Sequence, residues 1–283
     1  MLLHQSPSPP TPASTLASPE ADAILQRLRA GQAIALPTAV VAAHPDDETI
    51  SLGLRLSGFQ DLILVHMTDG ALESSEDAAR AGYVSRDAYR RARASELTRS
   101  LASLGATGRR IGLGVADQGA AGDLVALTHR LAKILGQVEV VITHAFEGGH
   151  PDHDAAAFAV QAACALLERE GARTPLRLEF AGYHLRDGER VTGSFWPGPD
   201  CARPVLGRGD LERKRAALAC FDSQAAVVAW FDPEAEAYRP APAYDFKFPP
   251  PPGAALYDRF GWPLTSAIWR GRACHALAAL GLS

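Results

Sequence analysis

Short runs of apolar residues alternate with longer stretches of helical periodicity through the first two thirds of the chain. The apolar runs are rich in β-branched residues and predict strands at 38–43, 62–67, 110–113, 138–143 and 176–182. Apolar residues at helical spacing predict helices at 21–30, 49–58, 85–104, 123–135 and 152–169. This alternation indicates an α/β, Rossmann-like fold, in which helices flank a mostly parallel sheet. Such sheets bind ligands at the carboxyl ends of their strands, so we expect the active site there.

The two ends of the chain lack this alternation. Residues 1–20 are rich in Pro, Ser and Thr and bury too little apolar surface to order themselves, so we expect a flexible tail. Residues 186–209 carry several Gly and Pro residues, 211–230 fit a helix, and about 231–283 are irregular. We expect a single domain over 21–283, whose later part packs on the sheet and lines one wall of a cleft.

The composition narrows the class of protein. With 283 residues and 47% hydrophobic content, the chain can bury a core without a metal, so we expect any metal site to be catalytic. The net charge of −4 argues against a nucleic-acid partner, and the basic residues from Arg86 to Arg99 are interpreted as a solvated helix face. Four scattered cysteines provide neither a disulfide framework nor a thiolate zinc site. We predict a cytoplasmic protein, because the chain has no membrane span and no secretion signal.

The sequence AHPDDE, at 43–48, directly follows the first predicted strand. Pro45 disfavours helix at His44, which keeps that residue extended at the strand end. Acidic residues are favoured at a helix N-terminus, so helix capping is the simplest alternative explanation. Capping alone needs one such residue and does not account for a histidine followed by three acids at a strand end.

The sequence EGGHPDH, at 147–153, directly follows the predicted strand at 138–143. Both motifs therefore occupy loops on the same edge of the sheet. Imidazole nitrogens and carboxylate oxygens are common zinc ligands, and three protein ligands leave a position open for water or substrate. Two His/Asp clusters at equivalent strand ends predict a catalytic metal site.

These two strings, AHPDDE and GHPDH, resemble the motifs of the LmbE-like, or PIG-L-like, family of zinc-dependent de-N-acetylases. The resemblance extends over about 38–230 and includes the segment from Lys214 to Gln224. Two departures concern neighbouring positions. The segment 50–54 stands where many relatives carry glycines, and Gly148 stands where one branch of the family has a tyrosine.

The resemblance also implies roles for single residues. One Zn²⁺ per chain would be bound by His44, Asp47 and His153. Asp46 would be the general base, and His150 would help to stabilise the oxyanion. Asp152 would be the partner that orients one of the histidines.

Several other residues have weaker indications. Asp69, after the strand at 62–67, and Glu147, beside the second motif, could contact substrate. His66 is interpreted as a core histidine, and the role of His144 stays open. One branch of the family has a tyrosine where this chain has Gly148. Tyr183 and Tyr244 are candidates to replace it, on residue type alone. We interpret Trp230, Trp262 and Trp269 as core residues. The alternative is that they form a wall on which a sugar stacks.

The family resemblance implies hydrolysis of an N-acyl amide, N-acetyl above all, on a small-molecule amino sugar or glycoconjugate. A close alternative is a metalloamidase that acts on a non-sugar amide or thiol conjugate. An alternative of another class is a binding protein that keeps the fold but catalyses no reaction. Asp46 argues against this alternative, because a binding protein has little use for a carboxylate that binds no metal. The sugar, the pathway and the oligomeric state are not predicted.

Overall fold

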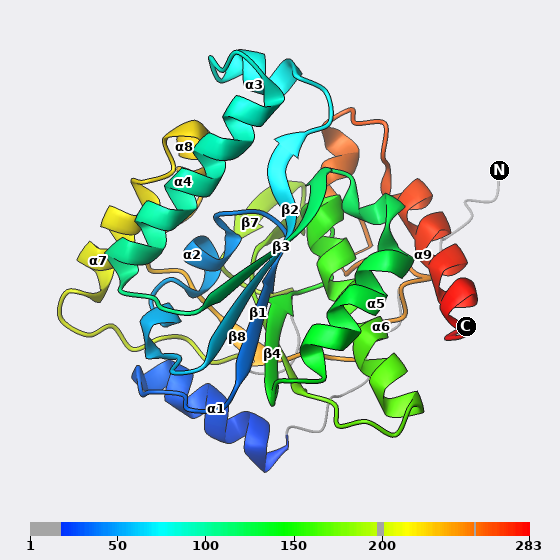
Figure 1. Ribbon diagram of the computed structural model, residues 1–283, viewed down its shortest axis with the longest axis horizontal. Helices are drawn as coiled ribbons and strands as arrows, with labels where there is room; N and C mark the ends of the chain where they lie inside the picture. The colour runs from blue at the N-terminus through cyan, green and yellow to red at the C-terminus, as the bar shows by residue number, and fades with distance from the viewer. Residues whose placement is uncertain (1–17, 197–200, 252) are drawn as a thin grey trace.

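The computed structural model describes residues 18–196, 201–251 and 253–283. Its centre is a six-stranded sheet in the order β3–β2–β1–β4–β5–β8 (Figure 1). The strands are β1 (Thr38–Ala42), β2 (Leu62–Leu72), β3 (Arg109–Asp117), β4 (Val140–His144), β5 (Leu176–Phe180) and β8 (Tyr238–Pro240). β1 to β5 are parallel, and β8 pairs with β5 in antiparallel orientation. This arrangement confirms the predicted α/β fold.

β1 lies inside the sheet, at the point where the winding of the chain reverses. Val40 pairs with Leu64 of β2 on one side and with Ile142 of β4 on the other. The chain adds β2 and β3 on the first side and then crosses to β4 and β5 on the second. The carboxyl ends of β1 and β4 flank the crevice that such a reversal opens, and both histidine motifs follow these strands.

Helices cover both faces of the sheet. Ala39 and Val41 face the layer formed by α5 (Leu124–Leu135), α6 (Pro151–Arg169) and α9 (Ser266–Leu280). Val40 faces the other layer, formed by α1 (Pro19–Ala30), α4 (Arg86–Leu104) and α7 (Asp210–Leu218). Figure 1 shows the first layer on the right and the second on the left and below. The central strands are buried on both faces, which explains their continuous apolar sequence.

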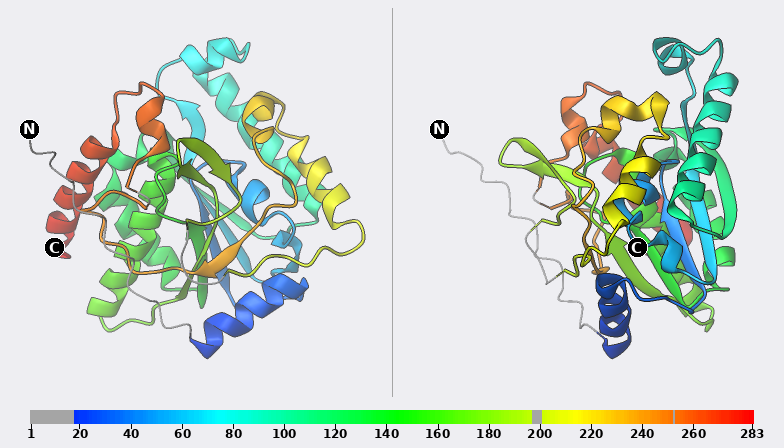
Figure 2. Two further views of the ribbon diagram at one scale, coloured as in Figure 1. Left: turned by 180° about the vertical axis from the view of Figure 1, so that it is seen from behind. Right: turned by 90° about the vertical axis from the view of Figure 1, so that its left-hand side faces the viewer.

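Short elements complete the fold. They are α2 (Asp47–Leu52), α3 (Glu76–Arg80), β6 (Tyr183–Arg186), β7 (Glu189–Thr192), α8 (Ala225–Val228) and the 3₁₀ helices η1 (Leu56–Gly58), η2 (Ala120–Gly122), η3 (Asp222–Gln224) and η4 (Leu256–Arg259). Figure 2 shows the β6–β7 hairpin, α8 and the segment around η4 near the carboxyl ends of the strands. The later part of the chain therefore closes over this edge of the sheet.

Some elements end at other residues than predicted. The helix expected at 49–58 ends at Leu52. The helix expected at 211–230 stops at Leu218, because Phe221 adopts a non-helical backbone (φ −91°, ψ 63°) and its ring is buried in the core. β3 continues past the predicted end at residue 113 to Asp117.

The chain termini can be compared with prediction only in part. The expected tail at 1–20 lies mostly outside the described residues, and Ser18 already accepts the N–H of Ala21 at 3.2 Å as the cap of α1. The C-terminal part was expected to be irregular but contains the helix α9, where Trp269 is fully buried and donates its indole N–H to Pro151 O at 3.0 Å. Within the described ranges, no helix is long and apolar enough to cross a membrane.

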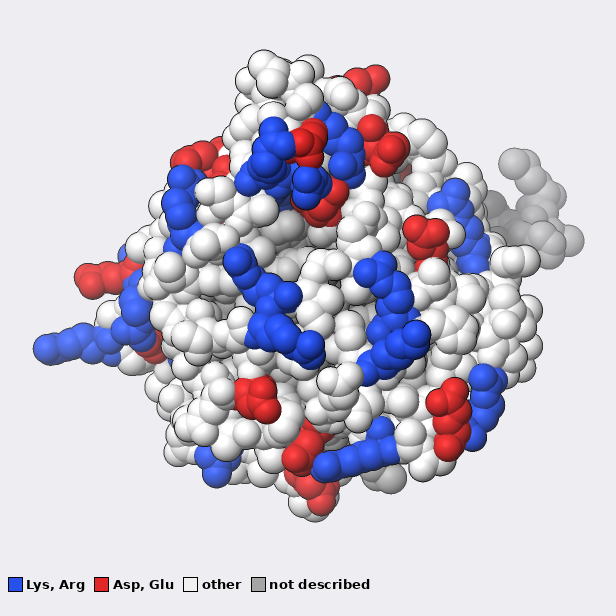
Figure 3. Space-filling model, in the orientation of Figure 1, with Lys and Arg blue, Asp and Glu red and all other residues white. Residues whose placement is uncertain are grey.

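Charged side chains of both signs share the surface. On the face seen in Figure 3, Lys and Arg are interspersed with Asp and Glu. Arg90, for example, lies 2.7 Å from Asp87, and both side chains are exposed. Such pairs each contribute about 0.2–1 kcal/mol to stability, so the fold depends on its buried core instead.

Candidate metal centre and active site

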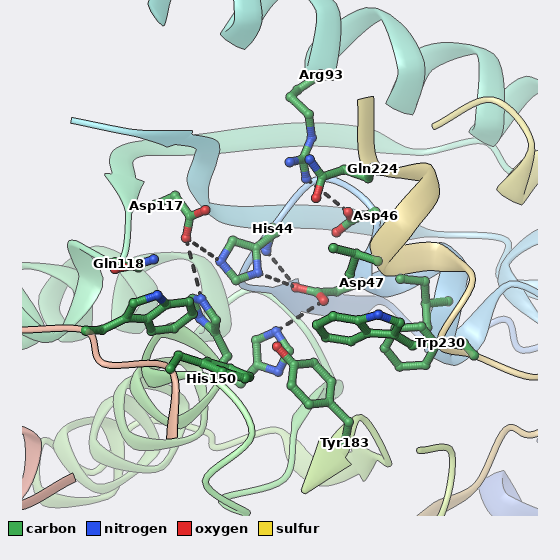
Figure 4. Close-up of a pocket in the computed structure, with 16 residues that line it drawn as sticks. His44, Asp46, Asp47, Arg93, Asp117, Gln118, His150, Tyr183, Gln224 and Trp230 are labelled. Atoms are coloured by element: carbon green, nitrogen blue, oxygen red, sulfur yellow. Dashed lines mark hydrogen bonds and ion pairs between the residues drawn. The ribbon is translucent and has the colours of Figure 1, made fainter. Parts of the chain in front are cut away.

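A cavity of about 430 Å³ opens beside the carboxyl ends of the central strands (Figure 4). Five of the residues predicted for the site line it together: His44, Asp46, Asp47, His150 and His153. Their side chains are largely buried, so water screens their charges only weakly. The two motifs, far apart in the sequence, thus form one site.

A tight turn after β1 directs the first motif into the cavity. The N–H of Asp46 donates to His44 O at 2.9 Å, and the N–H of His44 donates to Asp47 Oδ2 at 2.7 Å. α2 begins at Asp47. The turn therefore presents one imidazole and two carboxylates to the same cavity.

Asp47 joins the two motifs. Its Oδ2 lies 3.2 Å from His44 Nδ1, and its Oδ1 lies 3.2 Å from His153 Nε2. His144, whose role the sequence left open, also approaches Asp47, at 3.4 Å. Burial disfavours the charged carboxylate, but His153 and His144 outweigh this effect and hold the pKa of Asp47 well below its usual range.

His44 is surrounded by carboxylates. Besides Asp47, its Nε2 lies 3.1 Å from Asp117 and 3.3 Å from Asp152. Burial disfavours a charge on this imidazole, yet Asp117 and Asp47 raise the pKa of His44 well above its usual value. The carboxylates around His44 therefore favour a positive charge at this position, which a proton or a bound metal ion can supply in competition with each other.

The donor atoms fit a metal ion. Three sets have ligand atoms within 4.8 Å of one another: His44, His150 and His153; His44, Asp117, His150 and Asp152; and Asp47, His144 and His153. Among the described residues, the expected trio of His44, Asp47 and His153 is not itself such a set, although each pair of Asp47 with one of the two histidines is in contact at 3.2 Å. His153 Nδ1 is buried without a hydrogen-bond partner in the described part of the chain. Neutral imidazoles and carboxylates are a donor set suited to zinc.

The second motif begins α6. His150 is the N-cap, and its Nδ1 accepts the N–H of Asp152 at 3.2 Å. With Nδ1 an acceptor, the ring proton lies on Nε2, which is 3.7 Å from Asp117 Oδ1. Burial and the neighbouring His44 lower the pKa of His150 well below its usual value. His150 is therefore a neutral hydrogen-bond donor at the cavity.

Asp152 lies behind this layer of side chains and is fully buried. Its carboxylate accepts the N–H groups of Gln118 at 2.6 Å and Ala120 at 3.1 Å, and it contacts His44. Gln118 is held at φ +63°, a strained value for a residue other than glycine. Asp152 thus fixes both the loop after β3 and one face of His44.

Arg93 reaches the site from α4. Its Nη2 lies 3.0 Å from Asp46 Oδ2, and its Nη1 donates to Gly70 O at 3.1 Å. The interpretation of 86–99 as a solvated face is therefore wrong for Arg93 and for Glu96, which accepts a hydrogen bond from Ser223 at 2.8 Å. Both residues lie on the helix face that packs against the protein.

Asp46 is a buried carboxyl group that lines the cavity. Burial raises the pKa of this carboxyl group to about 6, against the opposing effect of Arg93. A carboxyl group with a pKa near neutral pH can accept a proton and later return it. Figure 4 shows Asp46 beside the histidine cluster, on the side that faces Arg93.

Two residues predicted as substrate contacts lie elsewhere. Asp69 is not part of the cavity lining, and its carboxylate is held by Arg86 at 3.0 Å. Glu147 is buried, accepts the N–H of Gly182 at 2.9 Å and lies 3.2 Å from His184. Both carboxylates thus hold neighbouring parts of the chain.

The remaining candidates divide between core and cavity. His66 is a buried histidine paired with Glu48 at 3.0 Å, as its apolar strand predicted. Tyr244 hydrogen-bonds to Glu179 at 2.9 Å and does not line the cavity, whereas Tyr183 does. Figure 4 shows the Tyr183 hydroxyl group turned toward the histidines.

Sequence reasoning missed Asp117. It ends β3, so it occupies the same sheet edge as the two motifs, and it contacts His44 and approaches His150. The predicted strand ended at residue 113, which left Asp117 in an unassigned loop. A search for acidic residues after each strand end would have found it once β3 was given its full length.

The fold and the site define a Rossmann-like α/β protein with a buried His/Asp cluster, suited to a metal ion, at the strand ends. Residues 39–164 match the PIG-L family model, described as GlcNAc-PI de-N-acetylase. This match spans both motifs and confirms the resemblance predicted from them.

Solved structures share the fold. The zinc-inhibited form of teicoplanin deacetylase is 16% identical, covers 67% of this chain and 85% of its own, and has a TM-score of 0.50. A deacetylase–teicoplanin complex is 17% identical over 73% of this chain and 100% of its own, with a TM-score of 0.53. The 4-carboxy-2-hydroxymuconate hydratase of Pseudomonas putida KT2440 is 17% identical over 74% and 97%, with a TM-score of 0.52. No curated protein sequence matches the chain.

Proposed function

We propose that this protein hydrolyses an N-acyl amide, with acetyl as the acyl group, on an amino sugar or glycoconjugate and releases acetate and a free amine. The carrying observation is that Asp46, a buried carboxylate, lies in one cavity with the His/Asp cluster. The match of residues 39–164 to the PIG-L model supports the same reaction.

The metal in this proposal is one zinc ion per chain, with His44, Asp47 and His153 as its ligands. When bound, zinc polarises the amide carbonyl group and makes water a stronger acid. His44 and His153 share one set of closely spaced ligand atoms, and Asp47 and His153 share another, which supports this ligand set. Asp152, through its contact with His44, would orient that ligand.

The protein side chains would move the protons. Asp46 takes one proton from the attacking water as the new C–O bond forms. His150 Nε2–H, a neutral donor at the cavity, stabilises the negative charge that develops on the carbonyl oxygen. The C–N bond then breaks as the nitrogen receives a proton from Asp46 or His150.

A second candidate is a metalloamidase for a non-sugar amide. The same side chains would catalyse that reaction, and the cavity lining includes several aromatic residues that do not require a sugar. The likeness to a hydratase with the same fold shows that architecture alone does not decide the reaction.

The test is amine release from a panel of N-acetylated sugars, glycoconjugates and non-sugar amides, comparing zinc-loaded with chelator-stripped protein. Zinc-dependent release from sugars is the expected result. Release from non-sugar amides alone would favour the second candidate. No release from any member of the panel, with metal bound, would refute the hydrolase proposal.

A further inference from the structure

One part of the cavity lining is built from apolar side chains. They come from two segments of the later chain, one after α8 and one after η4, and from α2 and α8 themselves. The group, called here the aromatic wall, consists of Ile50, Val227, Trp230, Phe231, Phe260 and Trp262.

The aromatic wall is not simply an extension of the core. Phe260 is 37% exposed, and Trp230 and Trp262 are partly exposed, whereas Trp269 is fully buried. Trp262 lies beside His150, with ring centroids 5.2 Å apart. Partly exposed aromatic residues gathered at a cleft typically mark a surface that a ligand covers.

The wall is held in place by its own contacts. The guanidinium group of Arg190 lies over the ring of Trp230, 3.7 Å from its centroid. Tyr183 meets Trp230 edge-on at 6.0 Å and lies 5.2 Å from His153. Because these rings are already ordered, a ligand can pack on them without a large entropic cost.

The six side chains of the wall carry no charge, and Arg190, which lies over Trp230, is not part of the cavity lining. Within the described cavity lining, the charged carboxylate and guanidinium groups belong to Asp46, Asp47, Arg93 and Asp117, all beside the histidine cluster. Arg93 is already engaged by Asp46 and Gly70 O. The cavity lining therefore offers no unengaged guanidinium group, and burying an anionic group against the apolar side chains of the wall would be costly.

We infer that the site takes substrates with an uncharged, apolar group larger than acetyl, which packs on the aromatic wall while the amide lies at the histidine cluster. This inference rests on the proposed hydrolytic function. The apolar group belongs either to the acyl chain or to the aglycone of an amino sugar. Both sources share the same chemistry, and substrates that vary one end at a time distinguish them.

The experiment measures kcat/KM for four substrates with zinc-loaded protein. They are N-acetylglucosamine, N-hexanoylglucosamine, its N-adipoyl counterpart with a terminal carboxylate, and octyl N-acetylglucosaminide. We expect the hexanoyl compound or the octyl glycoside to exceed N-acetylglucosamine by about tenfold or more, since each buried methylene group favours binding. The adipoyl compound should fall about tenfold below the hexanoyl compound.

Variants connect this preference to the wall. The measured ratio is kcat/KM for the preferred apolar substrate (hexanoyl compound or octyl glycoside) divided by kcat/KM for N-acetylglucosamine. Trp230→Ala and Phe260→Ala should reduce this ratio about tenfold. Phe248→Ala is the matched control, because Phe248 is 43% exposed and lies outside the cavity lining. The inference would be overturned if neither the hexanoyl compound nor the octyl glycoside exceeded N-acetylglucosamine in kcat/KM. It would also be overturned if the ratio stayed unchanged in both wall variants.

Binding separates this inference from the proposed function. Calorimetry with the octyl glycoside and N-acetylglucosamine measures the same preference without turnover. Tighter binding of the octyl compound that weakens in Trp230→Ala, with no hydrolysis of any substrate, would support the wall and refute the hydrolase. Equal binding of both sugars, with hydrolysis intact, would refute the wall alone.

Discussion

Replacement of Lys214 by Met should destabilise the protein strongly, although Lys214 does not line the cavity. Its ammonium group is fully buried, pairs with Glu236 and donates to Ile50 O at 2.7 Å. Glu236 in turn accepts the N–H of Leu54 at 3.0 Å and the hydroxyl group of Tyr238. This network ties α7 and the segment before β8 to α2, the helix that carries Asp47.

The expected cost follows from what Lys214→Met leaves behind. The carboxylate of Glu236 stays buried without its cation, and removal of one partner of a buried pair typically costs about 3–5 kcal/mol. Urea unfolding measures this as a lower midpoint at unchanged slope. In a double-mutant cycle, adding Glu236→Gln should recover part of the loss, with a coupling energy of about 0.5–3 kcal/mol.

Arg213→Met is the control, because Arg213 lies on the same helix and its guanidinium group, which pairs with Asp210, is half exposed. It should change the free energy of unfolding by about 1 kcal/mol or less. The reasoning would be refuted if Lys214→Met cost no more than Arg213→Met. It would also be refuted if the effects of Lys214→Met and Glu236→Gln were strictly additive.

Three further predictions concern the site. Asp46→Ala should lower turnover at least about a hundredfold, with metal content by mass spectrometry nearly unchanged; normal turnover would exclude it as the general base. His153→Ala should lose the metal, and full occupancy in that variant would remove it from the ligand set. Gly149→Ala should lose both stability and activity in thermal and kinetic assays, because its Cβ would lie 1.9 Å from the carbonyl oxygen of Tyr183. Gly112→Ala, where a Cβ meets nothing within 4 Å, serves as its control and should leave both unchanged.

The central sheet was predictable because its strands are buried on both faces. Runs such as Thr38–Ala42 and Val140–His144 have no polar alternation to mislead the assignment, and Gly105 marks the end of α4. The break at Phe221 was not predictable, because it depends on a ring that packs in the core and on Ser223, which Glu96 holds from another helix. Tertiary contacts of this kind override local periodicity.

The site was predictable as far as its motifs are contiguous. His44, Asp46 and Asp47 stand together in the sequence, as do His150 and His153, and the structure brings all five to one cavity. Arg93 and Asp117 could not be recognised in this way. Each is a single residue whose role comes from the neighbour it meets in space, Asp46 and His44 respectively.

The cluster and the aromatic wall come largely from different stretches of the chain. The cluster side chains stand at or shortly after the carboxyl ends of β1, β3 and β4, whereas most of the wall comes from residues 227–262. Mutations in the later stretch can therefore reshape what the protein accepts while the proton-transfer groups keep their setting. Chimaeras that graft this stretch from a relative onto residues 18–196 would show whether reaction and selectivity are inherited separately.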